Sequence, residues 1–250
     1  MAASYLKGRK YQSMLRKLVK RMALSQGYLI KNVSKNYQPD KGYVLYDYKK
    51  PDGTFDYELY KSIQTQGNKE KINKTWVSED NIKMLGAYVQ KLLKDKPQFG
   101  LCHGTRRGNE QKWFKEVLGC DVLGTEISDT AEDFPDTIQW DFHDVKPEWL
   151  GAVDFIYSNS FDHSFDPPKC LDAWMSCLKP GGVCILEYTT GHEIADADEL
   201  DPFGAEITHM PFLIAKWGQG RYSVREILEG EKKFDYVPDV LFFVVQNHDA

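Results

Sequence analysis

The chain has 250 residues, of which 42% are hydrophobic and 28% are charged, a composition that is ordinary for a soluble globular protein. This length allows one α/β domain with a sizeable core and is short for two. No apolar run approaches the roughly 18–20 residues of a membrane-spanning helix. Lys and Arg interrupt the apolar residues near the N-terminus every few positions, whereas a signal peptide has a continuous apolar segment. The five scattered cysteines form neither a CxxC pair nor a metal-type spacing with histidine, so we expect no metal centre and a reducing, cytoplasmic compartment.

The N-terminal arm differs from the rest of the chain in charge. The net charge is −5, but residues 1–39 carry +9 with no Asp or Glu, so the remainder carries −14. This arm predicts an amphipathic helix, because apolar residues recur at helical spacing among the basic ones, at Tyr11, Met14, Leu15, Leu18 and Met22. A helix that is basic on one face either packs on its own domain or binds an anionic membrane surface or another acidic partner.

A loop region and a helix are predicted before the alternating strands and helices begin. Residues 36–56 are rich in Pro, Gly, Asp and Tyr and predict a loop with one short strand or hairpin, with a turn at the PDG of residues 51–53. Ser78 is a good N-cap for a following helix, and the two acidic residues after it favour the positive end of the helix dipole. We expect this helix to continue until Pro97 ends it.

The sequence then alternates between strands and helices, which predicts a parallel sheet covered on both faces. We therefore divide the chain into an N-terminal basic helix with a cap or loop extension, residues 1–75, and one α/β domain, residues 76–250. No element is predicted between residues 190 and 238. The predicted strands are 98–103, 120–127, 137–142, 153–159, 181–188 and 241–247, and the predicted helices are 109–118 and 167–178.

Glycines and acidic residues stand where the first three strands are expected to end. Gly104 and Gly108, in the segment GTRRGNE, let the backbone turn tightly and present its N–H groups to a ligand. Glu126 ends the second strand, where Rossmann-type folds bind the two hydroxyls of a ribose. After the third strand, the carboxylate of Asp141 can accept a hydrogen bond from an adenine amino group, and Phe142 can pack on the ring face.

In this order, these residues resemble those of the class I S-adenosylmethionine-dependent methyltransferases, over residues 97–188. The fourth strand VDFIYSN and the turn LKPGG, Leu178–Gly182, also match that family. The resemblance implies an α/β fold of the Rossmann-like methyltransferase type, with a mostly parallel doubly wound sheet, helices on both faces and an antiparallel C-terminal strand. It also implies S-adenosylmethionine as cofactor, bound by Gly104, Thr105, Arg106, Gly108, Glu126, Ile127, Asp141, Phe142, Asn159 and Ser160.

The chain departs from the family pattern at two places. The family commonly has Asp or Glu two residues before the first glycine of the loop, whereas this chain has Cys102. The third glycine of the loop is also missing, and Arg106 and Arg107 stand between the two that remain. The backbone donors are kept, but the amino-acid end of the cofactor needs other partners.

The segment NSFDHSFD, residues 159–166, follows the fourth strand and in this fold lies beside the transferred methyl group. Methyl transfer to a hydroxyl requires alignment of the acceptor and removal of its proton. His163 is the candidate base, because an imidazole pKa near 6.5 suits proton removal at neutral pH, and Asp162 could orient it or bind the acceptor. Alternatively, His163 caps a helix or contacts the cofactor. The acidic stretch 195–204 lies where a loop that covers the substrate would belong.

We expect methyl transfer, at oxygen, to a small-molecule or sugar acceptor such as a glycan precursor. The motifs look closer to a branch found among surface-glycan and natural-product tailoring enzymes than to nucleic-acid methyltransferases. Two alternatives stay open. One is a nucleic-acid methyltransferase that uses the basic arm, which the acidic body and the absence of an NPPY-type motif disfavour. The other is a methyltransferase-like binding protein without activity. Peripheral contact with an anionic membrane would involve residues 1–35.

Overall fold

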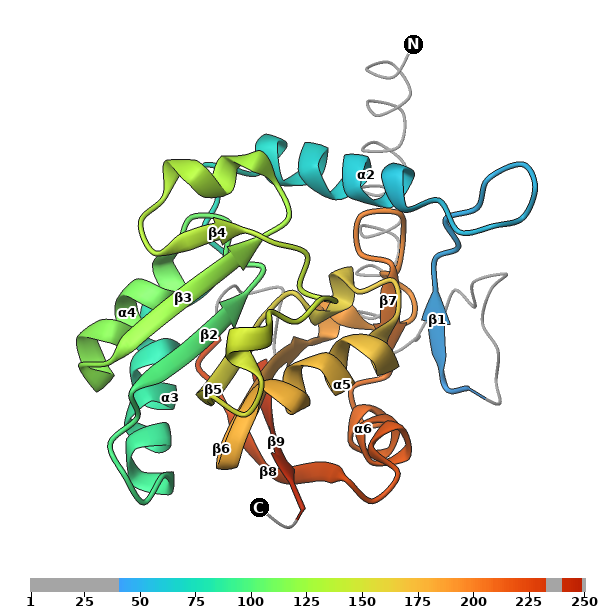
Figure 1. Cartoon of the computed structure of the whole chain (residues 1–250). Coiled ribbons are helices and arrows are strands. Elements are labelled where there is room, and N and C mark those ends of the chain that lie inside the picture. Colours follow the sequence, from blue (N-terminus) through green and yellow to red (C-terminus); the bar gives the residue numbers. More distant parts are fainter. Residues whose placement is uncertain (1–40, 233–239, 249–250) are drawn as a thin grey trace, which may run out of the picture. The chain divides into compact units, whose positions relative to one another are not determined.

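The computed structural model describes residues 41–232 and 240–248, which all belong to one compact unit, Lys35–Ala250 (Figure 1). The basic helix predicted within residues 1–35 lies outside these described residues. In the described part of the chain, no helix is both long and apolar enough to cross a membrane.

A seven-stranded sheet forms the centre of this unit, in the order β4-β3-β2-β5-β6-β9-β8. β9 runs antiparallel to both of its neighbours, and the other four pairs are parallel. This arrangement confirms the predicted fold class, including the antiparallel C-terminal strand. The strands are β2 (Phe99–His103), β3 (Asp121–Glu126), β4 (Thr137–Gln139), β5 (Val153–Ser158), β6 (Leu178–Thr189), β8 (Tyr222–Glu229) and β9 (Val240–Asn247).

Helices cover both faces of the sheet (Figure 1). Phe155 and Ile156, adjacent in β5, point into different cores, the first packed with α3 and α4 and the second with α5 and α6. Because both faces of the strands are buried, they appear in the sequence as nearly continuous apolar runs. The helices are α2 (Tyr57–Glu70), α3 (Glu79–Leu92), α4 (Asn109–Leu118), α5 (Pro167–Cys177) and α6 (Met210–Gly218), with 3-10 turns η1 (Asp129–Asp133), η2 (Pro147–Trp149), η3 (Phe161–His163) and η4 (Thr190–His192).

The predicted elements of the α/β region are confirmed, with differences at some ends. α4 has the predicted bounds, and α3 begins after Ser78, whose hydroxyl accepts the N–H of Asn81. α3 ends at Leu92, before Pro97. β4 is shorter than predicted, because Asp141 begins a turn in which its Oδ1 accepts the N–H of His143.

Other elements lie where none is predicted. α2 occupies the segment before Ser78, and its N-cap Asp56 accepts the N–H of Leu59 at 3.0 Å. In the 36–56 region, by contrast, both the predicted short strand, β1 (Tyr43–Leu45), and the predicted turn are present. β1 pairs with β7 (Phe203–Ala205) in a separate two-stranded sheet, and α6 and β8 follow.

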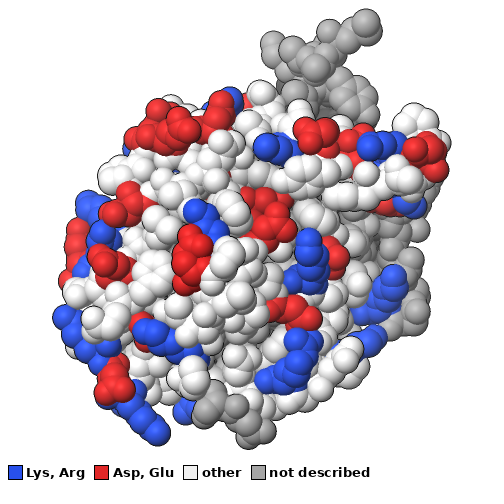
Figure 2. Space-filling view, viewed as in Figure 1, with Lys and Arg blue, Asp and Glu red and all other residues white. Residues whose placement is uncertain are grey.

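Charged side chains are mixed on the surface. On the face seen in Figure 2, Lys and Arg side chains alternate with Asp and Glu side chains rather than forming one continuous basic area. Some are paired, as in Lys115 with Asp136 and Lys69 with Asp129. A nucleic-acid surface would instead present a concentrated basic stripe.

Candidate active site

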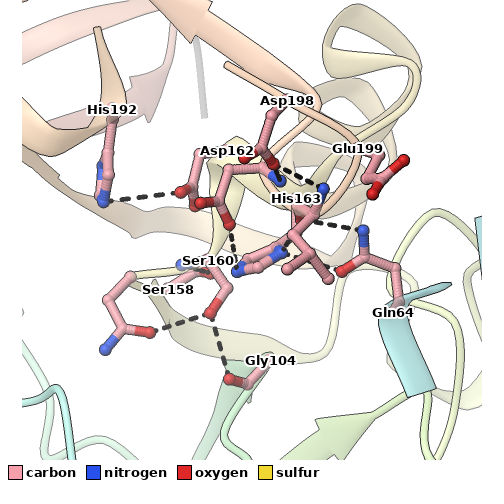
Figure 3. Close-up of polar contacts among 12 residues, drawn as sticks. Gln64, Gly104, Ser158, Ser160, Asp162, His163, His192, Asp198 and Glu199 are labelled. Atoms are coloured by element: carbon pink, nitrogen blue, oxygen red, sulfur yellow. Dashed lines mark hydrogen bonds and ion pairs between the residues drawn. The ribbon is translucent and has the colours of Figure 1, made fainter. Parts of the chain in front are cut away.

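The strand order reverses between β2 and β5, because the chain continues from β2 to β3 and β4 on one side and from β5 to β6 on the other. In open α/β sheets, ligands bind at the carboxyl ends of the strands beside such a switch point. Two serines join the loops there. The Ser158 hydroxyl donates to the carbonyl oxygen of His103 at 3.0 Å, and the Ser160 hydroxyl donates to that of Gly104 at 3.1 Å (Figure 3).

Gly104 is the first residue after β2 and requires a glycine for two reasons. Its φ is +73°, in the left-handed region that other residues rarely adopt. A Cβ atom there would also lie 2.5 Å from Cβ of Ser160, on the neighbouring loop. The backbone can therefore approach the switch point closely, as the loop of a nucleotide-binding fold must.

Backbone N–H groups hold both carboxylate oxygens of Glu126, at the end of β3. Oε1 accepts from the N–H of Ser128 at 3.0 Å, and Oε2 accepts from that of Arg106 at 3.2 Å. The side chain is buried, and burial raises the pKa of Glu126 above its ordinary value. The side chain of Asn68 also forms a hydrogen bond with this carboxylate. A carboxylate has about four acceptor positions, so Glu126 can still accept a hydrogen bond from a further hydroxyl group.

Both carboxylate oxygens of Asp141 accept hydrogen bonds from side chains or backbone of the chain. Its Oδ1 accepts from the backbone N–H of His143 at 2.9 Å and from Nδ1 of that ring at 2.7 Å, and its Oδ2 accepts from the Tyr57 hydroxyl at 2.8 Å. Burial acts to raise the pKa of Asp141, but the hydrogen bonds from His143 outweigh burial and lower it. Oδ2 keeps one acceptor position. An ionised carboxylate with one free position suits an amino group.

The two carboxylates line adjoining depressions that α2 borders. A cavity of about 50 Å³ includes Glu126, Asp141 and His163 in its lining. A more open depression of about 290 Å³, lined partly by Tyr57 of α2, shares Ile127 and Asp141 with it. In the first cavity, α2 contributes residues from one helix face, and its C-cap Lys71 lines the cavity as well; the helix residues are Tyr60, Gln64, Gly67 and Asn68.

Seven of the ten predicted cofactor-binding residues line the first cavity, namely Gly104, Arg106, Glu126, Ile127, Asp141, Phe142 and Ser160. The other three do not line it. Thr105 is a buried residue of the 104–108 loop, Gly108 is the N-cap of α4, and the buried side chain of Asn159 accepts a hydrogen bond from the Ser160 hydroxyl. The cofactor-binding roles of all ten stay predictions.

His163 lies in η3 and lines the same cavity as Glu126. Its Nδ1 is 2.9 Å from Oε1 of Gln64 and 2.7 Å from the carbonyl oxygen of Leu200 (Figure 3). Its Nε2 is 3.6 Å from Oδ1 of Asp201. Side chains from α2, η3 and the loop before β7 therefore converge at this histidine.

Asp162 is buried next to His163. Its Oδ2 is 3.7 Å from Nε2 of His192 (Figure 3), while its Oδ1 has no hydrogen-bond partner among the described residues. Burial raises the pKa of Asp162 to about 6, with Asp201 adding to the rise and His163 opposing it. Possible ligand atoms of Asp162, His163 and Asp201 lie within 4.8 Å of one another, so these three could hold a metal ion.

Cys102 does not face the cavity. Its side chain is fully buried in the core beneath α3 and α4, and burial raises its pKa well above the ordinary value. An acidic residue at this position would lie in apolar surroundings. Basic groups do line the cavity, from Arg106 of the loop and Lys71 at the end of α2.

Several cavity residues escape prediction from the sequence. Gln64 and Asn68 belong to α2 and Lys71 is its C-cap, and the sequence gives little helical signal for α2 beyond the cap at Asp56. Asp201 belongs to the acidic stretch 195–204, so its segment is predicted to cover the substrate but its contact with His163 is not.

Comparison with known proteins agrees with this geometry. Residues 100–186 match the family model of the methyltransferase domain. Among solved structures, a chain from the complex between the Haloferax volcanii Trm112 methyltransferase activator and a methyltransferase aligns with a TM-score of 0.55 and 16% identity, over 78% of this chain and 100% of that one. The plantazolicin methyltransferase BpumL in complex with SAH aligns with a TM-score of 0.54 and 13% identity, over 76% and 94%. The mitomycin 7-O-methyltransferase MmcR aligns with a TM-score of 0.51 and 12% identity, over 68% and 54%. No curated protein matches the sequence.

The sheet order, the Gly104 loop and the acidic residues at the ends of β3 and β4 are features of the fold of class I S-adenosylmethionine-dependent methyltransferases. Residues 100–186 match a methyltransferase domain. The predicted family, enzyme class and cofactor are thereby confirmed.

Proposed function

We propose that this chain transfers the methyl group of S-adenosylmethionine to an oxygen atom of a small-molecule or sugar acceptor, such as a glycan precursor. The observation that carries the proposal is that Glu126, Asp141 and His163 line one cavity at the switch point of the sheet. When bound, the cofactor supplies a methyl group on a positively charged sulfur, whose C–S bond breaks as the acceptor attacks.

The first half of the cavity would bind the cofactor. The Glu126 carboxylate would accept hydrogen bonds from the ribose hydroxyls, and Asp141 has one acceptor position on Oδ2 for the adenine amino group. Phe142 lines the cavity beside Asp141 and can pack on the adenine ring. Gly104 and Gly108 allow the backbone of this loop to approach the amino-acid end closely. The backbone N–H groups of residues 104–108 all donate to oxygens within the chain, so side chains would supply the donors.

The second half would activate the acceptor. Nε2 of His163 accepts the hydroxyl proton as the new O–C bond forms, which leaves a neutral ether and an imidazolium ion. Asp201, 3.6 Å from that nitrogen, and the buried Asp162 next to it in sequence favour the positive charge electrostatically. Asp162 and His163 are therefore the proposed catalytic pair.

Two features support a small acceptor. Plantazolicin and mitomycin appear in the names of similar structures, although those acceptors belong to those proteins. Basic and acidic side chains are interspersed on the face of Figure 2. A cytoplasmic location belongs to the same proposal and is supported by five free cysteines, four of them buried. The predicted division at residue 75 also belongs to it, with peripheral membrane contact through residues 1–35.

The test has two stages. Titration calorimetry with S-adenosylmethionine measures cofactor binding, and the radiolabelled cofactor then reports transfer to sugars, nucleotide sugars, hydroxylated natural products, tRNA and DNA. Binding with transfer to a hydroxylated small molecule supports the proposal. Transfer to nucleic acid alone would assign a nucleic-acid methyltransferase instead, and the absence of cofactor binding would leave a binding protein without this activity.

A further inference from the structure

His163 makes its closest polar contacts through Nδ1, the ring nitrogen that does not face Asp201. Oε1 of Gln64 lies 2.9 Å from it and the carbonyl oxygen of Leu200 lies 2.7 Å from it. A carbonyl oxygen can only accept a hydrogen bond. The Gln64 amide is oriented because its Nε2 donates to the same Leu200 oxygen at 2.9 Å, which turns Oε1 toward the ring. Both oxygens therefore require a proton on Nδ1.

We propose that Gln64 is a positioning residue that, together with the Leu200 carbonyl, holds the neutral His163 ring with its proton on Nδ1 and its lone pair on Nε2. This inference rests on the proposed function, because a base must present a lone pair to the acceptor. The opposite tautomer would direct a lone pair at two oxygens and would leave Nε2 already protonated. The protein thus selects the tautomer that can accept a proton.

The groups around this contact come from three segments. Tyr60 of α2 donates from its hydroxyl to the carbonyl oxygen of His163 at 3.1 Å, which fixes the backbone of η3. Asp198 shapes the loop, because its Oδ1 accepts the N–H groups of Leu200 at 2.7 Å and of Asp201 at 3.2 Å. The charged groups that act on this region are Asp162 of η3, Lys71 of α2 and Asp201 of the loop.

α2 therefore has two functions in this proposal. It lines the cavity that contains Glu126, and it carries the amide that sets the tautomer of His163. Gly67 permits this close packing, because a Cβ atom there would lie 2.6 Å from Cδ2 of Leu200. The base is correctly oriented only while α2 is docked.

The test is the nitrogen-15 spectrum of the histidine rings in the full chain, recorded without an acceptor at a pH where the rings are neutral. Long-range proton–nitrogen correlations distinguish a protonated Nδ1 from a protonated Nε2, and His163→Gln identifies the signals by their loss. We expect His163 to be protonated on Nδ1. Protonation on Nε2 in the wild-type protein would overturn the proposal without any variant. Cofactor binding and methyl transfer are measured separately, by calorimetry and by the acceptor assay, so their outcome is distinguishable from that of the tautomer.

Gln64→Met removes the amide while keeping the length of the side chain, so a population with the proton on Nε2 should become visible. Gln64→Glu keeps an acceptor and should retain the wild-type tautomer. Gln66→Met is the matched control, because Gln66 is exposed on the same helix and donates to Glu70. Once an acceptor is known, the single-turnover rate of Gln64→Met should fall about tenfold, less than the 10²–10⁴-fold loss expected from removing a base. A Gln64→Met spectrum identical to wild type, with thermal unfolding intact, would assign Gln64 a packing role only.

Discussion

The hydroxyl group of Tyr57 donates a 2.8 Å hydrogen bond to Oδ2 of Asp141, although 84 residues separate the two in the sequence. This bond joins the first turn of α2 to the proposed adenine ligand. It complements the two contacts that His143 makes to Oδ1 of the same carboxylate. α2 therefore takes part in the geometry of both proposed ends of the site, at Asp141 and at His163.

Tyr57→Phe should weaken cofactor binding modestly. The substitution removes one hydrogen bond that orients Asp141 but no direct contact with the cofactor. We therefore expect Kd to rise by roughly 2- to 10-fold, less than the loss of a direct bond to a charged group, which contributes about 1.5–3 kcal/mol, would cause. Titration calorimetry with S-adenosylmethionine checks this. Tyr88→Phe is the control, because the Tyr88 hydroxyl bonds Glu226 at 2.8 Å, outside both depressions. Equal Kd values for Tyr57→Phe and wild type would remove α2 from adenine recognition.

Glu126→Ala should weaken cofactor binding at least about tenfold with the fold intact, because two hydrogen bonds to a charged group contribute about 1.5–3 kcal/mol each. Calorimetry measures Kd, and thermal unfolding reports the fold. Glu116→Ala, which removes an exposed carboxylate from α4, is the matched control. An unchanged dissociation constant for Glu126→Ala would contradict the assignment of the ribose site.

His103 should make stability depend on pH. It is buried in β2, with Nδ1 2.8 Å from the Thr125 hydroxyl, and burial together with the nearby His143 lowers its pKa to about 3. The folded ring stays neutral, whereas the unfolded chain binds a proton below about pH 6.5. The contribution is therefore fully present above about pH 6.5 and is lost as the pH falls toward 3.

Urea unfolding of wild type and His103→Leu between pH 4 and 8 isolates this residue, because the other groups are common to both proteins. The free energy of unfolding should fall with decreasing pH more steeply in wild type, by up to about 1.4 kcal/mol per pH unit below pH 6. His248→Leu, at an exposed histidine, should keep the wild-type slope. Parallel curves for wild type and His103→Leu would show that folding does not lower the pKa of His103.

The sequence predicts α4 and the strand ends but misses α2, and the reason is physical. α4 lies between Gly108 and Gly119 and has an apolar face, so its own residues are sufficient to predict the helix. The buried face of α2 is formed by Tyr60, Gln64, Gly67 and Asn68, which gives no hydrophobic periodicity. Gln64 and Asn68 are buried because they bond Leu200 and Thr130, partners that only the tertiary fold supplies.

The same distinction holds within the site. Glu126 and Asp141 could be predicted because the ends of parallel strands meet at one edge of the sheet. Asp201 could not, because its place beside His163 depends on the path of the loop between η4 and β7. The Asp198 turn that sets this path is visible only once its two backbone hydrogen bonds are known.

The arm of residues 1–35 should attach the protein to anionic membranes if it does not pack on its own domain. Vesicles that contain acidic lipid should sediment the full chain at low salt and release it as the ionic strength rises, because salt screens the attraction between the basic residues and the lipid headgroups. Neutral vesicles are the control. Equal recovery in the supernatant with both kinds of vesicle would favour the packed helix.

His163→Ala should lower the rate of methyl transfer by about 10²–10⁴-fold, because the acceptor then loses its proton without a positioned base. The cofactor Kd should stay nearly unchanged. The measurement is single-turnover transfer at saturating cofactor across pH, with His248→Ala as a control at an exposed histidine. A loss of cofactor affinity with the saturated rate preserved would instead make His163 a cofactor contact.

A metal ion on Asp162, His163 and Asp201 would lead to the same loss of rate in His163→Ala by another route, since their ligand atoms lie within 4.8 Å of one another. Removal of metal ions with a chelator distinguishes a metal-dependent reaction from one in which His163 acts as the base. With His163 as the base, the wild-type rate is unchanged by excess chelator and by added Mg²⁺ or Mn²⁺. A rate that disappears with chelator and returns with metal would make Nε2 a metal ligand, and proton removal would then depend on the ion that it binds.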